Sequence, residues 1–101
     1  MVANGMRPIH PGEILREEFL EPLCITPTAL ARALHVSTPT INEIVRERRG
    51  VTADIAIRLG RYFDTSPQFW MNLQSEYALI IAIAEAGQEI EQEIEPLLAQ
   101  A

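Results

Sequence analysis

Apolar residues in this chain recur three and four positions apart, which is the spacing of an amphipathic helix. Serine, threonine and proline divide this pattern into five segments, since Ser and Thr are good helix N-caps and proline suits the first helical turn. No stretch alternates apolar and polar residues with period two, as a half-buried strand does. The sequence therefore predicts an all-α fold of five helices joined by short connections.

The same residues predict where each helix begins and ends. Pro11 opens the first helix and Pro22 stops it, because an internal proline interrupts helical hydrogen bonding. The other four helices have Ser or Thr at the expected N-cap, namely Thr26, Ser37, Thr52 and Ser66. The five predicted helices cover about residues 11–21, 27–34, 38–46, 53–63 and 67–86.

The length of 101 residues favours a single domain. Residues 1–9 carry no helical period and are expected to be a loose lead-in. Residues 10–86 are expected to form the helical domain, and residues 87–101 an acidic C-terminal tail.

The fifth helix contains an unusual segment, because residues 78–84 are apolar on every side. A domain of this size has too little material to cover such a helix internally. A second copy packed across a two-fold axis would cover it, and the residues predicted at this dimer interface are Leu79, Ile80, Ile81 and Ile83. The alternative is that the tail forms a short helix and folds back over the segment, with inward-facing Ile90, Ile94, Leu97 and Leu98.

Residues 26–46 have the spacing of a helix-turn-helix, in which two short helices are joined by a turn of about three residues. The second helix, about residues 38–46, would enter the major groove of DNA, where amide, guanidinium and hydroxyl groups read base edges. The residues expected to contact bases are Thr38, Thr40, Asn42 and Arg46. The residues expected to contact phosphates are Ser37, Arg48 and Arg49.

The net charge of −6 would oppose DNA binding if it were evenly spread. All eight basic residues are arginines at or before Arg61, and six glutamates with no basic residue follow Ser75. Residues 1–75 are therefore neutral overall, and phosphate binding responds to local potential rather than to the charge of the whole chain. The charge distribution is thus compatible with a double-stranded DNA partner.

Other charged residues near the predicted interface are ambiguous. Glu43 and Glu47 would repel phosphate unless they pair with Arg46 or Arg49. Arg58 and Arg61 are weaker phosphate candidates, because the fourth helix is expected to face away from DNA. Simple solvation of helix surfaces is the alternative interpretation for each of these side chains.

The sequence offers little support for catalysis. The cysteine and the two histidines, Cys24, His10 and His35, match no zinc spacing, and no glycine-rich phosphate loop is present. We therefore expect no enzyme activity, no metal and no cofactor. A single cysteine fits a reducing cytoplasm, and neither a signal peptide nor an apolar run long enough to cross a membrane is recognisable.

Several stretches are distinctive enough to compare with known families. They include His10-Pro11-Gly12-Glu13, Arg48-Arg49-Gly50-Val51-Thr52-Ala53-Asp54 and Phe69-Trp70-Met71-Asn72-Leu73-Gln74. With them, the chain resembles the HigA antitoxins of the Xre (lambda-repressor-like) helix-turn-helix class over about residues 8–79. The family usually has glycine where this chain has Cys24 and His35, so these two turns are expected to need a positive φ.

The resemblance implies a five-helix lambda-repressor-like domain that forms a homodimer. The C-terminal tail lies beyond the resemblance, and its own residues predict that it is helical. It implies further that the protein represses its own operon and neutralises a HigB-type toxin, a ribosome-dependent mRNA endonuclease. The family often carries Arg or Lys where this chain has Thr38 and Glu43, so no base preference follows. A solitary dimeric regulator without a cognate toxin is the alternative.

Overall fold

The computed structural model describes residues 7–100, so most of the predicted lead-in, residues 1–6, lies outside the described residues. The predicted all-α fold is confirmed, with five helices and no strand in the described range. The segments are α1 (Pro11–Ile14), η1 (Leu15–Leu20), α2 (Glu21–Leu23), α3 (Pro27–Leu34), α4 (Thr38–Val45), α5 (Ala53–Phe63), α6 (Pro67–Glu93) and η2 (Leu97–Gln100). The first three are continuous and together form the first predicted helix, and η2 is a 3₁₀ turn in the tail.

The first helix does not stop at Pro22, and this prediction was wrong. The helix continues to Leu23, and η1 is a widened π-helical turn just before the proline. Because a proline ring clashes with the carbonyl group four residues earlier, a wider turn upstream lets the chain pass residue 22 without breaking. The helix ends instead at Cys24, whose φ of 56° is left-handed.

The predicted N-caps are confirmed in all four remaining helices. Each hydroxyl oxygen accepts the backbone N–H three residues later, at 3.1 Å for Thr26, 3.3 Å for Ser37, 3.3 Å for Thr52 and 3.0 Å for Ser66. These bonds satisfy backbone donors that have no partner inside the helix, and each is worth about 1 kcal/mol. The helix starts are therefore fixed locally by the sequence.

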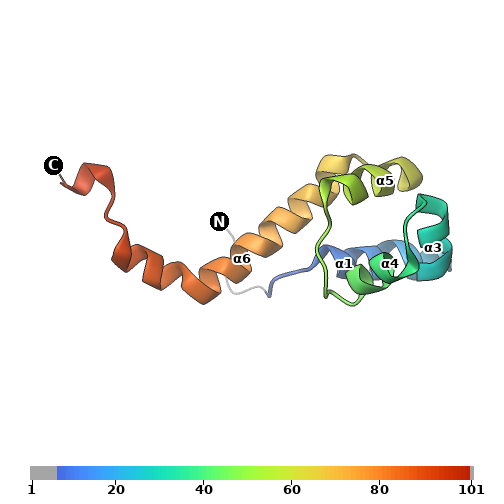
Figure 1. The fold of residues 1–101 in the computed structure, drawn as a ribbon, viewed down its shortest axis with the longest axis horizontal. Coiled ribbons are helices and arrows are strands. Elements are labelled where there is room, and N and C mark those ends of the chain that lie inside the picture. Colours follow the sequence, from blue (N-terminus) through green and yellow to red (C-terminus); the bar gives the residue numbers. More distant parts are fainter. Residues whose placement is uncertain (1–6, 101) are drawn as a thin grey trace.

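The core lies where the first helix, chiefly its η1 segment, meets α3, α4, α5 and the first turns of α6 (Figure 1). Its largest fully buried side chains include Trp70 of α6, whose indole N–H donates to Thr65 Oγ1 at 2.8 Å. Gly12 permits the closest backbone approach, because a Cβ at this position would lie 1.8 Å from the carbonyl oxygen of Ile44. The first helix therefore contacts α4 directly through backbone atoms.

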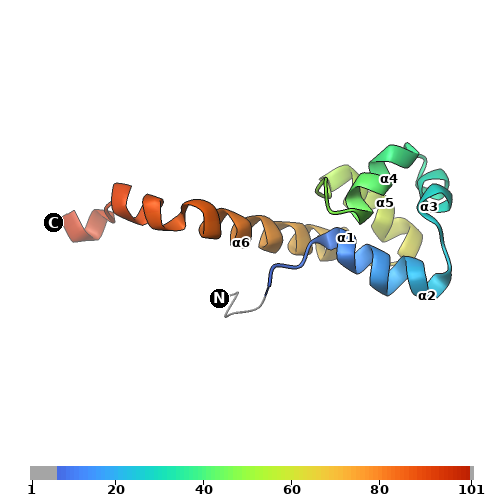
Figure 2. The ribbon, with the colours of Figure 1, turned by 90° about the horizontal axis from the view of Figure 1, so that it is seen from below.

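The last helix leaves the globular part and projects away from it (Figures 1 and 2). The molecule measures 57 × 23 × 21 Å as a result. The alternative that the tail folds back over α6 is wrong, since Ile90, Ile94, Leu97 and Leu98 are 50%, 64%, 81% and 90% exposed. Residues 87–93 are the end of α6 itself, and the helix ends shortly before Pro96, which disfavours helical backbone at the residue before it.

Candidate nucleic-acid interface

The helix-turn-helix consists of α3, a turn over residues 35–37, and α4. His35 has a φ of 59°, and Val36 N–H donates to the Ala31 carbonyl oxygen at 3.0 Å, which closes α3 with a left-handed cap. The predicted need for positive φ at Cys24 and His35 is therefore confirmed. The core-facing side chains Leu30, Ala31, Leu34, Ile41 and Ile44 are all buried.

The outward face of α4 carries the side chains predicted to contact bases. Arg46, at the C-cap, is exposed, and its guanidinium makes no hydrogen bond or ion pair with any other described residue. Asn42 is half-buried one turn earlier, and Thr38 and Thr40 are half-buried on opposite edges of the face. A polar, outward helix face with one free guanidinium matches the requirements for reading base edges.

Three of the predicted contact residues form one polar cluster. Ser37 Oγ and Thr40 Oγ1 lie 2.7 Å apart, and Arg49 Nη1 donates to Thr40 Oγ1 at 3.3 Å. Arg49 also forms an ion pair with Glu43 at 2.9 Å. The expected pairing of Glu43 with an arginine is therefore present. Both side chains of the pair remain nearly half exposed. The ion pair is consequently weak and can rearrange.

The loop after α4 presents the remaining predicted phosphate contact. Arg48 is exposed and without a side-chain partner in the described range. Glu47 adopts a left-handed φ of 62° and pairs with Arg16 at 3.3 Å, not with Arg46 or Arg49. The negative charge of Glu47 is thereby directed toward the first helix.

Two residues outside the predicted site hold this loop in place. Arg16 donates from Nη1 to the carbonyl oxygen of Val45 and so caps the C-terminus of α4. Gln74 of α6 accepts the Val51 N–H through Oε1 at 2.6 Å, and a Cβ at Gly50 would lie 2.7 Å from the same oxygen, so a side chain there would push the Gln74 amide away. Neither role was predicted from the sequence; a polar residue one turn after the buried Trp70 is the signal that marks Gln74.

The two weaker phosphate candidates, Arg58 and Arg61, differ in whether their guanidinium groups already have partners. Arg58 donates to the Leu34 carbonyl oxygen at 2.7 Å and pairs with Asp54 at 2.9 Å, so it caps the C-terminus of α3. Arg61 is exposed and has no side-chain partner among the described residues. Only Arg61 therefore remains available to a ligand.

The predicted dimer residues lie on the projecting half of α6. Leu79 and Ile83 are 56% and 53% exposed, and Ile80 and Ile81 are half-buried. These exposed aliphatic side chains favour an interface, because contact of apolar surface with water is unfavourable in free energy.

The histidine and cysteine considered as metal ligands do not come together in a metal site. His10 is buried and its Nδ1 accepts the Gly12 N–H at 2.8 Å, and Cys24 is exposed. No cluster of three or more His, Cys, Asp and Glu side chains suited to a metal ion occurs in the described part of the chain. Across the described range, no helix combines the length and apolar character needed to span a bilayer.

Comparison with known proteins identifies the family of helix-turn-helix proteins that this chain resembles. A family model described as helix-turn-helix matches residues 17–70, which spans α3, α4, α5 and the start of α6. The solved antitoxin HigA of Pseudomonas aeruginosa, determined with the higBA promoter, is 72% identical and superposes with a TM-score of 0.89 over 90% of this chain and 99% of that chain. The antitoxin GraA, solved in complex with its operator, is 54% identical with a TM-score of 0.88 over 96% of this chain and 98% of that one.

A curated relative extends the comparison. Virulence-associated protein I of Dichelobacter nodosus is 60% identical over 79 residues, which cover 78% of this chain and 73% of the relative. The chain belongs to the HigA-type antitoxins, a DNA-binding family of helix-turn-helix proteins.

Proposed function

We propose that this chain binds the operator of its own operon, represses transcription from it, and neutralises a HigB-type mRNA endonuclease encoded with it. The observation that carries DNA binding is the outward face of α4, which ends in the free guanidinium of Arg46 and is followed by the exposed Arg48. Two close relatives, P. aeruginosa HigA and GraA, were solved with promoter or operator DNA, which supports the same ligand class here.

In this proposal α4 lies in the major groove. Arg46 donates two hydrogen bonds to guanine, Asn42 reads adenine, and the methyl groups of Thr38 and Thr40 contact thymine. The phosphate contacts come from Ser37, Arg48 and Arg49. Contact of Arg49 with phosphate requires it to exchange its ion pair with Glu43, which costs little because the pair is exposed.

The functional unit in this proposal is a homodimer formed through α6. A single copy has only a few free cations beside Glu43 and Glu47, so its affinity for DNA is expected to be low. Two copies place two α4 helices in successive major grooves about 34 Å apart. Residues 10–86 then act as the DNA-binding and dimerising domain, and residues 87–101 as an acidic tail.

Operator binding is tested by fluorescence anisotropy with DNA from upstream of the chain's own gene at about 50 mM salt, where phosphate attraction is strong. Arg46→Ala is expected to weaken binding by about 1–3 kcal/mol, or roughly 5- to 150-fold, because a base contact is lost. Arg61→Ala removes the same charge from α5 and is the matched control, with a much smaller effect. Equal losses in both variants, or no binding by the wild type, would contradict the proposal.

Toxin neutralisation uses a different surface in this proposal, so the two activities separate by mutation. Arg46→Ala is expected to lose operator binding and to protect cells from the co-expressed toxin as well as the wild type does. A variant that loses both activities would place the toxin on α4 and contradict this division. Absence of a small basic reading frame beside the gene favours the alternative, a solitary dimeric regulator.

No catalytic step is part of this proposal, and neither a metal nor a cofactor is required by it. Recognition of operator DNA and of an mRNA endonuclease places the proposed activity in the cytoplasm.

A further inference from the structure

The far end of α6 and the segment that follows it carry exposed aliphatic side chains. Ile90 lies in the last turn of α6, Ile94 is its C-cap, and Leu97 and Leu98 lie in η2. All four side chains are at least half exposed. Apolar side chains gathered within nine residues are more favourable in free energy when another surface covers them.

The globular part of the same chain does not reach these side chains. Tyr77 of α6 still contacts the ring of His10, but Ile90 follows thirteen residues later, roughly 20 Å farther along the helix. Both views of the fold show this end of the chain projecting away from the core (Figures 1 and 2). A separate molecule is therefore needed to cover it.

Glutamates flank the exposed aliphatic residues. Glu91 lies on one side of Ile90 and Glu89 and Glu93 lie on the other, because successive helical residues are turned by about 100°. No basic residue lies in the last turn of α6, where the helix dipole places partial negative charge and disfavours carboxylates. Glu89 and Glu93 also repel each other four positions apart. Together with the four aliphatic residues, these three glutamates form the tail surface, and cations from a partner would relieve its repulsion.

We propose that the tail surface binds a basic protein, namely the mRNA endonuclease of the proposed function. The inference rests on that function and assigns the surface that carries toxin neutralisation. A protein that acts on mRNA needs arginine and lysine side chains to hold phosphates, so it brings the charge that the tail surface lacks. The aliphatic side chains supply the apolar centre of the contact, and the glutamates pair with cations around it.

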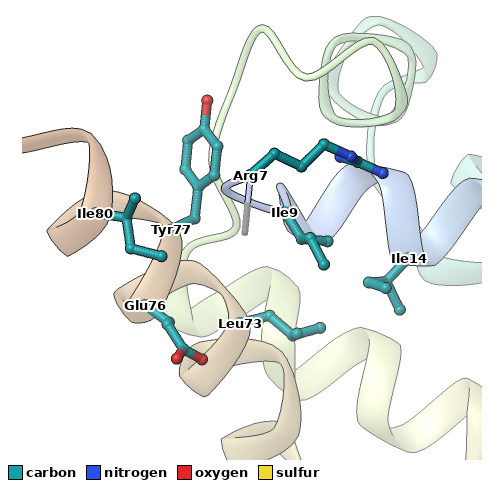
Figure 3. A pocket seen from close by; sticks show the side chains of 7 residues that line it. All are labelled: Arg7, Ile9, Ile14, Leu73, Glu76, Tyr77 and Ile80. Atoms are coloured by element: carbon teal, nitrogen blue, oxygen red, sulfur yellow. The ribbon is translucent and has the colours of Figure 1, made fainter. Parts of the chain in front are cut away.

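A second apolar surface of the chain fits a basic partner less well. It is a pocket of about 220 Å³ between α6 and the segment before and within α1 (Figure 3). Ile9 and Ile14 line one side of it, and Leu73 lines the other. Its two charged residues, Arg7 and Glu76, have opposite signs. The pocket therefore offers apolar contact without a net attraction for a cationic surface.

The position of the tail surface leaves the DNA-binding face of the same copy free. α4 lies in the globular part, and the tail surface lies at the opposite end of the long axis, which measures 57 Å (Figure 1). A toxin bound to the tail surface does not need to cover Arg46 or Arg48. This separation in space is the physical reason to expect that mutation separates operator binding from toxin neutralisation.

Calorimetric titration of the whole chain with the toxin encoded in the same operon tests the apolar contacts. The double variant Leu97→Ser, Leu98→Ser is expected to bind the toxin at least about tenfold more weakly, because two aliphatic side chains lose their burial. The double variant Leu23→Ser, Ile57→Ser removes two exposed aliphatic side chains from the globular part and is the matched control. Its affinity is expected to stay near that of the wild type, with circular dichroism confirming that both variants are helical.

The same titration at two salt concentrations tests the charges. The double variant Glu91→Gln, Glu93→Gln is expected to bind the toxin several-fold more weakly at about 50 mM salt and as well as the wild type at about 500 mM, where screening is strong. The double variant Glu18→Gln, Glu21→Gln removes the same charge from the first helix and is the control. Equal losses in both variants would show that only the total charge matters and would overturn the assigned surface.

The remaining outcomes distinguish this inference from the function on which it rests. A wild type that binds the toxin while Leu97→Ser, Leu98→Ser binds it equally well refutes the tail surface alone. Sedimentation equilibrium is expected to give this variant the same association state as the wild type, and dissociation into monomers would show that a second copy covers the surface and overturn the proposal. A wild type that binds operator DNA but neither binds the toxin nor protects cells from it refutes toxin neutralisation itself.

Discussion

At the scale of single residues, the first helix depends on the imidazole of His10. The residue is 3% exposed, its Nδ1 accepts the Gly12 N–H at 2.8 Å, and its ring lies edge-on to Tyr77 at 4.8 Å. Nδ1 is an acceptor only when it carries no proton, so the cap requires neutral histidine. Burial lowers the pKa of His10; the smaller influence of Glu47 raises it, and that of Arg16 lowers it further.

We predict that the chain becomes less stable as the pH falls below 6.5, the ordinary pKa of His10. Below that pH the unfolded chain binds a proton at this position that the folded chain still excludes. The contribution is therefore complete above 6.5 and is lost as the pH falls toward the lowered pKa. Urea denaturation at pH 7.5 and at pH 5.5 measures the difference in the free energy of unfolding.

His10→Asn is the control for this prediction, because asparagine caps helices without titrating in this range. Its stability is expected to vary less between the two pH values than that of the wild type. Identical pH dependence in both proteins would show that other groups cause the loss. His10→Ala is expected to lose about 1 kcal/mol at pH 7.5 through the missing cap alone.

At the scale of elements, the loop after α4 is held by side chains from two other helices. Arg16 in η1 caps α4, and Gln74 in α6 binds the backbone at Val51. The guanidinium groups of Arg46 and Arg48 therefore project from a loop with both ends fixed. Fixing a binding loop in advance lowers the entropy lost on binding.

Gln74→Met is expected to weaken operator binding several-fold, because the Val51 N–H loses its acceptor and the loop becomes more mobile. A stability loss of about 1–3 kcal/mol should accompany it. Gln68→Met is the matched control on the same helix, since Gln68 bonds only to the exposed Asn72. Anisotropy well below the melting temperature compares the two, and equal affinity would refute a positioning role for Gln74.

The elements differ in how far the sequence determines them. Helix starts were predictable because Ser and Thr caps act within four residues, and α3, α4 and α5 followed from their apolar period. The passage of the first helix through Pro22 was not predictable, because it depends on a π-helical turn that no side-chain pattern records. The full length of α6 was not predictable either, because the helix continues through Gly87, a residue type that commonly ends helices. The residues of the helix-turn-helix were predictable from spacing, whereas Arg16, Arg58 and Gln74 act across 23 or more residues of sequence.

At the scale of the whole molecule, charge is separated along the long axis. All arginines lie in residues 7–61, and the six glutamates after Ser75 lie along α6 and the tail, which project from the globular part (Figure 2). Such a field acts beyond direct contact, and salt screens it over about 10 Å at 0.1 M ionic strength. A negative field of this kind opposes the approach of DNA even where no acidic side chain contacts it.

Neutralising Glu89, Glu91 and Glu93 to glutamine is expected to increase the association rate with operator DNA at about 50 mM salt. The increase should shrink at about 200 mM salt, where screening is stronger. Stopped-flow anisotropy at both salt concentrations measures it. An increase that is independent of salt would indicate a direct contact of the tail with DNA instead of a long-range field.

α6 belongs to two structures at once, because Trp70 is fixed in the core and Ile83 is exposed thirteen residues later on the same unbroken helix. In the proposed dimer, the length of this segment sets both the distance and the relative rotation between the two α4 helices. Each residue inserted between Trp70 and Ile83 would move the two α4 helices apart. It would also rotate each α4 helix by about 100° relative to the two-fold axis. The length of this segment is therefore coupled to the helical phase of the half-sites in the operator, so that changes in one require compensating changes in the other.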